Sequence, residues 1–290
     1  MFDTITYKAF RKSQKSFLSK DGEIKFIEEG SGPALLLLHG IPTSGWLYRK
    51  MITPLVNEGY RVIVPDMLGF GGSDSPKGYE IYSEPIQAQR LLALMDSLKL
   101  KNWIHVFHDA GGLWTWELLK KQPNRINRLV ILNTIIYKDG FKPPIRFGRN
   151  FITKGIMTLY KTKLINDFLI KKLFEGGLSK VVLSKSELEG YRLPLLEGKI
   201  NGMYYFFSKT CHNIENYKSL LQSLNIPASV IWGKNDVFLL WKLQAEKVVE
   251  DLKITKDNIH LLDAKHFIQE EIPKEICNLI INYNSMKIAK

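Results

Sequence analysis

The chain has 290 residues, 45% of them hydrophobic and 24% charged, which is ordinary for a globular protein with one core and room for an inserted subdomain. No apolar run is long enough to cross a bilayer, and the first residues lack the apolar centre of a secretion signal. The formal net charge is +12. No zinc-finger, helix-turn-helix or RNA-binding pattern accompanies this charge, so it indicates a lysine-rich surface and not a nucleic-acid-binding protein.

Two cysteines, Cys211 and Cys277, stand far apart in the chain and in no ligand-like spacing. This pattern argues against a disulfide framework and a zinc site, and it fits a reducing compartment. We therefore expect a cytoplasmic protein that uses no metal and no cofactor.

Short apolar segments suited to buried strands alternate with amphipathic segments suited to helices. The predicted strands are residues 14–18, 23–28, 34–39, 61–65, 103–108, 128–133, 228–232 and 258–262. The predicted helices are residues 44–59, 84–98, 111–122, 240–253 and 268–283. This alternation predicts an α/β fold, with a mostly parallel eight-stranded sheet flanked by helices. An Asp-Gly turn at 21–22 predicts that the first two strands are antiparallel.

The alternation stops after the strand at 128–133. Residues 137–217 have a helical and aromatic pattern with no clear strand, and the sheet resumes at 228. We therefore predict that residues 137–217 form a helical cap subdomain, inserted into a core domain made of residues 1–136 and 218–290.

The strongest local motif lies where the strand at 103–108 meets the next helix. Asp109 stands at this junction and Gly111 and Gly112 follow. A tight strand-to-helix turn exposes the residue at its tip in a strained conformation, and glycines let the helix approach closely. The helix N-terminus would stabilise a carboxylate there. The alternative is that Asp109 is only a helix N-cap.

Other polar residues also follow predicted strands. Ile41 lies in a His-Gly-Ile-Pro turn that can direct a backbone N–H as an oxyanion donor. Asp236 and His266 lie beyond the carboxyl ends of two later strands, the edge where open α/β sheets bind ligands. The glycine-rich loop 66–74 lacks the Gly-Lys-Ser/Thr ending of a phosphate-binding loop, which argues against nucleotide binding.

Taken in order, these segments resemble the α/β-hydrolase superfamily, and in particular its branch with an aspartate nucleophile, the epoxide hydrolases and haloalkane dehalogenases. The resemblance covers residues 22–136 and 226–282. It rests on residues 39–44 (His-Gly-Ile-Pro-Thr-Ser), the loop 66–74 ending in Gly-Ser-Asp, residues 108–112 (His-Asp-Ala-Gly-Gly), residues 232–236 (Trp-Gly-Lys-Asn-Asp) and residues 266–271 (His-Phe-Ile-Gln-Glu-Glu).

The resemblance implies a catalytic triad and a covalent mechanism. Asp109 would attack the substrate and form an ester, and His266, oriented by Asp236, would activate the water that hydrolyses it. The backbone N–H groups of Ile41 and Ala110 would form the oxyanion hole. The substrates would be a small apolar molecule and water.

Three positions depart from the family pattern. Phe107 replaces the usual elbow glycine, Ala110 replaces the tryptophan that holds the halide in dehalogenases, and Ile41 replaces their asparagine. Without these halide donors, epoxide hydrolase-like chemistry is favoured. A cap tyrosine would then protonate the leaving oxygen, and the candidates are Tyr160, Tyr191, Tyr204 and Tyr205. Haloalkane dehalogenation is the first alternative, and a non-catalytic binding protein with this fold is the second.

The predicted cap is basic, with 14 Lys and Arg against 7 Asp and Glu over residues 137–217. Within 154–172, lysines alternate with apolar residues, a pattern that favours an amphipathic helix. We expect its apolar face to pack on the protein's own core and its lysines to face water. The alternative is weak contact with an anionic membrane, without stable insertion.

Overall fold

A computed structural model describes residues 5–143 and 145–288, with side chains as far as residue 283. It confirms the predicted fold class and each predicted strand to within two residues at either end. The strands of its eight-stranded sheet are β1 (Lys15–Ser19), β2 (Gly22–Glu29), β3 (Ala34–Leu38), β4 (Arg61–Pro65), β5 (Trp103–Asp109), β6 (Ile126–Thr134), β7 (Ala228–Gly233) and β8 (Ile259–Leu262).

The sheet has the strand order β1-β2-β4-β3-β5-β6-β7-β8. The strands β4, β3, β5, β6, β7 and β8 run parallel, whereas β1 pairs antiparallel with β2 and β2 pairs antiparallel with β4. The predicted antiparallel edge is therefore confirmed. Because the carboxyl ends of the parallel strands share one edge, the loops after β3, β5, β7 and β8 can meet there.

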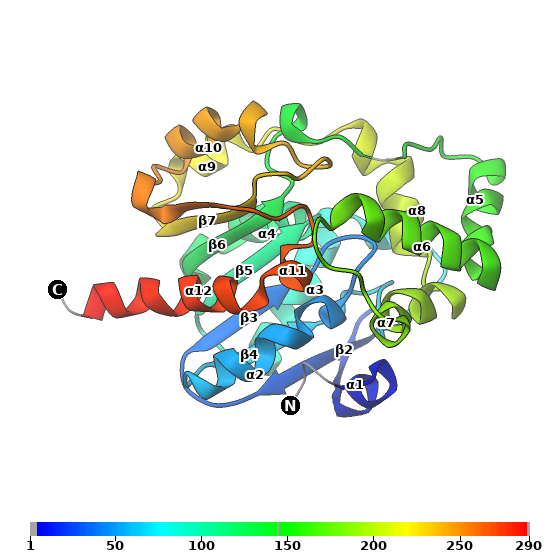
Figure 1. Cartoon of the computed structure of the whole chain (residues 1–290), viewed down its shortest axis with the longest axis horizontal. Helices are drawn as coiled ribbons and strands as arrows, with labels where there is room; N and C mark the ends of the chain where they lie inside the picture. The colour runs from blue at the N-terminus through cyan, green and yellow to red at the C-terminus, as the bar shows by residue number, and fades with distance from the viewer. Residues whose placement is uncertain (1–4, 144, 289–290) are drawn as a thin grey trace.

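Helices cover both faces of the sheet. Helices α2 and α12 lie side by side on one face, and α3 and α4 lie on the other (Figure 1). The described helices are α1 (Tyr7–Ser13), α2 (Arg49–Asn57), α3 (Glu84–Ser97), α4 (Gly111–Lys121), α5 (Phe151–Thr158), α6 (Lys163–Gly177), α7 (Lys185–Leu196), α8 (Asn201–Ser208), α9 (Lys218–Ser223), α10 (Ala245–Asp251), α11 (Ile268–Glu271) and α12 (Pro273–Ile288).

The helices differ from the sequence prediction at several places. The expected helices at 44–59 and 240–253 each begin with a 3₁₀ turn, and only residues 49–57 and 245–251 are α-helical. Helix α1 was not expected, and it buries Tyr7 and Phe10 against the ring of Trp46. The expected helix at 268–283 divides into α11 and α12 because Pro273 lacks the N–H that a continuous helix needs. The expected amphipathic stretch 154–172 divides into α5, a 3₁₀ turn (Leu159–Lys161) and α6.

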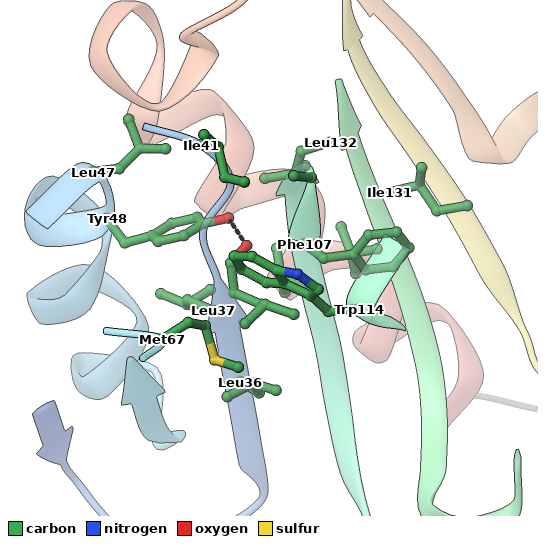
Figure 2. Packing of buried hydrophobic residues seen from close by; sticks show 14 of the residues in the cluster. Leu36, Leu37, Ile41, Leu47, Tyr48, Met67, Phe107, Trp114, Ile131 and Leu132 are labelled. Atoms are coloured by element: carbon green, nitrogen blue, oxygen red, sulfur yellow. Dashed lines mark hydrogen bonds between the residues drawn. The ribbon is translucent and has the colours of Figure 1, made fainter. Parts of the chain in front are cut away.

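The central strands are buried on both faces. All residues of β3 and β5 are buried, and Leu37 of β3, Phe107 of β5 and Leu132 of β6 belong to one buried hydrophobic cluster (Figure 2). Burying each such side chain contributes roughly 1.5–3 kcal/mol. The hydroxyl of Tyr48 donates to the carbonyl of Leu38 at 2.8 Å, which fixes the end of β3 close to the expected site.

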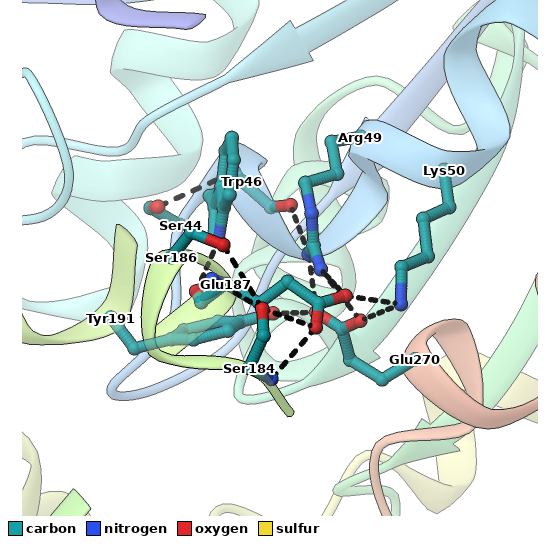
Figure 3. Close-up of polar contacts among 9 residues, drawn as sticks. All are labelled: Ser44, Trp46, Arg49, Lys50, Ser184, Ser186, Glu187, Tyr191 and Glu270. Carbon is teal, nitrogen blue, oxygen red and sulfur yellow. Dashed lines mark hydrogen bonds and ion pairs between the residues drawn. The ribbon is translucent and has the colours of Figure 1, made fainter. Parts of the chain in front are cut away.

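Between β6 and β7, the described residues form helices and connecting turns only, from α5 to α9 (Figure 1). Polar contacts join α7 to the core. Glu187 on α7 binds Arg49 and Lys50 of α2, and Tyr191 donates to Glu270 of α11 (Figure 3). The division at 137 and 217 into core and cap stays a prediction.

Candidate active site

Asp109 occupies the strained turn that the sequence indicates. It ends β5, and its φ of 51° lies in the left-handed region that side chains other than glycine rarely adopt. A Cβ on Gly111 would lie 2.7 Å from the carbonyl oxygen of His39, and one on Gly112 would lie 2.3 Å from Oγ1 of Thr134. Glycines at both positions therefore let α4 begin directly behind the tip.

Phe107 does not disrupt this elbow. Its ring packs edge-on against Trp116 of α4 at 5.2 Å, and it pairs in register with Ile131 of β6. The register between β5 and β6 shifts at the start of the strand, between Trp103 and Ile104, and again at the step from His108 to Asp109. The space that a glycine would leave is therefore filled by an aromatic contact between strand and helix.

Two backbone N–H groups bind the Asp109 carboxylate. The N–H of Ile41 donates to Oδ1 at 2.7 Å, and the N–H of Ala110 also donates to this carboxylate. Burial raises the pKa of Asp109, and the two donors and the nearby His266 oppose that rise. The two backbone N–H groups that were predicted to form an oxyanion hole thus both bind the carboxylate of Asp109.

His266 lies between two carboxylates. Its Nδ1 is 2.8 Å from Oδ2 of Asp236, and its Nε2 is 3.8 Å from Oδ2 of Asp109. Burial alone would lower the pKa of His266, but the negative charge and hydrogen bond of Asp236, with a further contribution from Asp109, raise it above its usual value. The Nδ1–H therefore points to Asp236, and Nε2 faces Asp109.

Asp236 is itself fixed from several sides. Its Oδ1 accepts from the backbone N–H groups of Phe238 at 2.8 Å and Leu239 at 3.0 Å. Its Oδ2 also accepts from Nδ2 of Asn133 at 2.6 Å. These three donors hold the carboxylate in the orientation that receives His266.

Asn133 is a site residue that the sequence reading missed. It is fully buried near the end of β6, and its Oδ1 accepts from the backbone N–H of Gly233 at 2.8 Å. The amide nitrogen of Asn133 thus binds Asp236, and its amide oxygen binds the end of β7. An amide at the carboxyl end of an otherwise apolar strand was the available signal.

His39 supports the turn that presents the Ile41 N–H. One ring nitrogen lies 2.7 Å from the carbonyl of Gly40, and the other accepts from the N–H of Met67 at 3.0 Å. Burial lowers the pKa of His39 to about 4, so the ring is neutral at pH 7. His39 is therefore a structural residue that joins the loops after β3 and β4.

The glycine-rich loop 66–74 folds around its own carboxylate. Buried Asp66 accepts from the N–H groups of Gly45 and Gly72, both at 2.7 Å, and from Gln14 at 2.7 Å. A Cβ on Gly71 would lie 2.2 Å from this carboxylate. The loop thus folds around the buried carboxylate of Asp66, which is consistent with the argument against nucleotide binding.

The four candidate tyrosines lie in different surroundings. Tyr191 donates to Glu270, Tyr204 donates to the carbonyl of Asn150 at 3.2 Å, and Tyr205 packs on the ring of Tyr79 with its hydroxyl close to Lys209. Tyr160 makes no hydrogen bond through its hydroxyl within residues 5–143 and 145–283, and burial raises its pKa.

Tyr160 also lines an apolar cavity of about 290 Å³. This cavity adjoins the triad residues, because Pro42 follows Ile41 and the ring of Phe238 lies 5.2 Å from the ring of His266. Its remaining lining residues are Ile145, Leu169, Ile170, Lys172, Leu173, Gly176, Met203, Phe207 and Val237. Of the four tyrosines, Tyr160 is the one that the cavity wall includes.

Over residues 5–143 and 145–283, no three His, Cys, Asp or Glu side chains come together as a metal site would require. Within the part of the chain that the structure describes, no helix has both the length and the apolarity to span a bilayer. Cys211 and Cys277 are both buried and free.

The sequence of the chain is similar to a protein-family model and to known proteins. A family model described as alpha/beta hydrolase fold matches residues 33–175. The chain is 25% identical over 298 residues to bifunctional epoxide hydrolase 2 of Mus musculus, covering 90% of this chain and 53% of that protein. The chain thus spans about half the length of this relative.

Two further similarities have fuller coverage. Haloalkane dehalogenase 2 of Mycobacterium bovis is 27% identical over 277 residues, covering 91% of this chain and 92% of that one. The crystal structure of an epoxide hydrolase from Vigna radiata superposes with a TM-score of 0.76 at 19% identity, covering 95% and 99% of the two chains. The sheet order, the family model and these relatives agree that the chain has the α/β-hydrolase fold.

Proposed function

We propose that this protein is an epoxide hydrolase-like enzyme that acts on a small apolar substrate through a covalent Asp109 ester. The observation that carries the proposal is the placement of one carboxylate between an oxyanion-binding turn and a histidine. Oδ1 of Asp109 accepts from the Ile41 N–H at 2.7 Å, while Oδ2 lies 3.8 Å from Nε2 of His266. One oxygen is held and the other is free to react.

In the first step, Oδ2 of Asp109 attacks an epoxide carbon. The new C–O bond forms as the ring C–O bond breaks, and the ring oxygen leaves as an alkoxide that takes a proton from an acid. We assign this acid to Tyr160, because Tyr160 lines the apolar cavity and its hydroxyl has no hydrogen-bond partner among the described residues. A raised pKa keeps the phenol protonated and able to donate.

In the second step, Nε2 of His266 takes a proton from water, and the hydroxide attacks the Asp109 carbonyl carbon. The oxyanion forms on Oδ1, where the N–H of Ile41 already donates, and the N–H of Ala110 next to the same carboxylate stabilises it further. Collapse breaks the acyl–oxygen bond, and the departing alkoxide takes the proton from His266. Asp109 is released as a carboxylic acid that loses its proton, and the Tyr160 phenolate regains one, by exchange with solvent. The sum is one epoxide and one water converted to one diol.

The order of preference between epoxides and halides follows from the donors at positions 41 and 110. Both residues have apolar side chains, so each offers the site only its backbone N–H, and these two groups already bind Asp109. A leaving halide would find no side-chain donor at either position, whereas a leaving alkoxide has Tyr160. Haloalkane dehalogenation remains the alternative because a dehalogenase is among the relatives.

Trapping of the ester tests the proposal. In His266→Gln, attack by Asp109 proceeds but ester hydrolysis stops, so incubation with an epoxide turned over by the wild type should add the mass of that epoxide to the peptide containing Asp109. Asp109→Asn is the matched control and should gain no mass. An adduct on another residue would show that the nucleophile is misassigned.

A further inference from the structure

Helices α5 and α6 and the turn between them expose large apolar side chains. Phe151 is 85% exposed, Leu164 is 81% exposed and Phe168 is 59% exposed. Ile152, Ile156 and Leu159 are also exposed, whereas Met157, Ile170 and Phe174 on the same helices are buried. The expectation that the apolar face of residues 154–172 packs on the core is therefore wrong for Ile156, Leu159, Leu164 and Phe168.

These side chains lie among lysines. Residues 151–172 contain five lysines and one acidic residue, a net charge of +4. The acidic residue, Asp167, is paired with Arg192. Lys154, Lys161 and Lys163 are exposed and have no ion-pair partner within the described part of the chain, and Lys171 and Lys172 share Glu175. We call residues 151–172 the α5–α6 face.

The α5–α6 face lies at one end of the molecule. Figure 1 shows α5 and α6 at the end opposite the C-terminus of α12. A surface at an end can meet a flat partner without obstruction from the rest of the fold.

We propose that the α5–α6 face binds reversibly to anionic lipid surfaces. Phenylalanine and leucine side chains surrounded by unpaired lysines match the boundary between acyl chains and anionic headgroups, where apolar groups leave water and lysines meet negative charge. A second copy of the chain is a poor match, because a twofold contact would bring the same positive face against itself.

If the proposed function holds, the position of the α5–α6 face would help apolar substrates reach the cavity. The inner side of α6 contributes Leu169, Ile170 and Leu173 to the apolar cavity, and Lys172 both lines the cavity and is exposed. The cavity thus reaches the surface beside the α5–α6 face. Docking on lipid would bring that opening to a reservoir of apolar substrates, although lipid binding itself does not depend on the chemistry of the site.

Sedimentation with vesicles tests the binding. The full chain is mixed with vesicles of phosphatidylcholine alone, or of phosphatidylcholine with phosphatidylserine, at low ionic strength. We expect co-sedimentation with the anionic vesicles only. Binding should be lost at about 1 M salt, where the Debye length falls to about 3 Å.

Two variants and a control locate the face. Lys161→Glu with Lys163→Glu should lower the partition coefficient by at least about 25-fold, from about fivefold for each lysine lost near the surface. Phe151→Ser with Phe168→Ser should weaken binding while leaving the charge unchanged. The control, Lys101→Glu with Lys256→Glu, makes the same charge change next to β5 and β8 and should bind nearly as the unaltered protein does.

Three results would overturn the proposal. One is no binding to anionic vesicles at low salt, and another is equal loss of binding in the control, which would indicate net charge alone. The third is a dimer in light scattering that Phe151→Ser with Phe168→Ser dissociates, which would assign the face to a second copy. Activity on a water-soluble substrate, measured alongside, reports separately on the proposed function.

Discussion

The Nε2 atom of His266 lies 3.8 Å from Oδ2 of Asp109, although the two residues are 157 positions apart in the chain and lie at the ends of different strands. The gap is longer than a hydrogen bond, which is typically 2.7–3.2 Å. Asp109 is therefore not held by His266, and its carboxylate is fixed instead by the backbone N–H groups of Ile41 and Ala110. This arrangement leaves the histidine available for a water once the carboxylate has become an ester.

At acidic pH, kcat/KM should increase steadily as the pH is raised. His266 must be neutral to accept a proton and Asp109 must be ionised to attack, and the pKa of each is raised, Asp109 by burial and His266 by Asp236. Below these pKa values both groups are protonated, so kcat/KM should rise with pH through a midpoint above 6.5. Initial rates across pH check this, and a profile that falls as pH increases from 5 to 7 would refute it.

Removing the charge of Asp236 should shift the His266 titration. In Asp236→Asn the attraction that raises the pKa of His266 is lost while its burial stays, so the pKa should fall below that of the wild type. NMR titration of the labelled imidazole measures this without need of activity. Asp263→Asn is the control, because that exposed carboxylate contacts Lys180 and Asn235 and not the imidazole.

Gly40 should be intolerant of even one methyl group. An added Cβ would lie 2.3 Å from Cβ of Asp109, so Gly40→Ala must displace the carboxylate or the turn that carries Ile41. We expect a loss of about 10²-fold in kcat/KM, the scale of a displacement of about 1 Å. Gly155→Ala, whose Cβ would meet no atom within 4 Å, should leave the rate unchanged. Equal rates in the two variants would contradict the geometry.

Substitutions of Tyr160 and Tyr204 should affect epoxide turnover differently, because the two side chains lie in different surroundings. The sequence left four candidate tyrosines, and of these Tyr160 lines the cavity, whereas the hydroxyl of Tyr204 donates to the carbonyl of Asn150. We expect Tyr160→Phe to lower epoxide turnover by roughly 10²–10⁴-fold, the scale of losing a positioned acid, and to leave any bromoalkane turnover unchanged. Tyr204→Phe is the matched control. If Tyr204→Phe is the slower enzyme, the assignment of the acid moves to Tyr204.

The buried ion pair between Arg49 and Glu270 should matter for folding (Figure 3). Both side chains are almost fully buried, so Arg49→Met leaves the Glu270 charge with only Lys50 and the Tyr191 hydroxyl. We expect a loss of about 3–5 kcal/mol in the free energy of unfolding, measured with urea. Arg49→Met with Glu270→Leu should recover much of this loss. A double variant that is less stable than Arg49→Met would show that the two substitutions destabilise the fold additively, and it would contradict this prediction.

Much of the sheet could be predicted from the sequence because its strands are short apolar runs between turn signals. Residues 34–38 and 103–109 are buried throughout, so burial on both faces leaves a continuous apolar pattern that is easy to recognise. The positions of Asp109, Asp236 and His266 after strands could likewise be predicted, since parallel strands end at one edge.

The surroundings of the site could not be predicted in the same way. Whether Tyr160 or Tyr204 faces the cavity depends on how α5 to α8 pack, and tyrosine suits both a core and a site. The contact of Asn133 with Asp236 joins residues 103 positions apart, and no local pattern reports such a pair. The exposed Leu164 and Phe168 were expected to be buried, because periodicity does not show which face of a helix meets the core.

The central claim is that Asp109 forms a covalent ester that water attacks at its carbonyl carbon. Mass spectrometry after a single turnover in H₂¹⁸O, with enzyme in excess over epoxide, tests it most directly. We expect ¹⁸O in the peptide containing Asp109 and an unlabelled diol, because the diol takes its new oxygen from the carboxylate. Label in the diol and none in Asp109 would show that water attacks the substrate directly and would contradict the account.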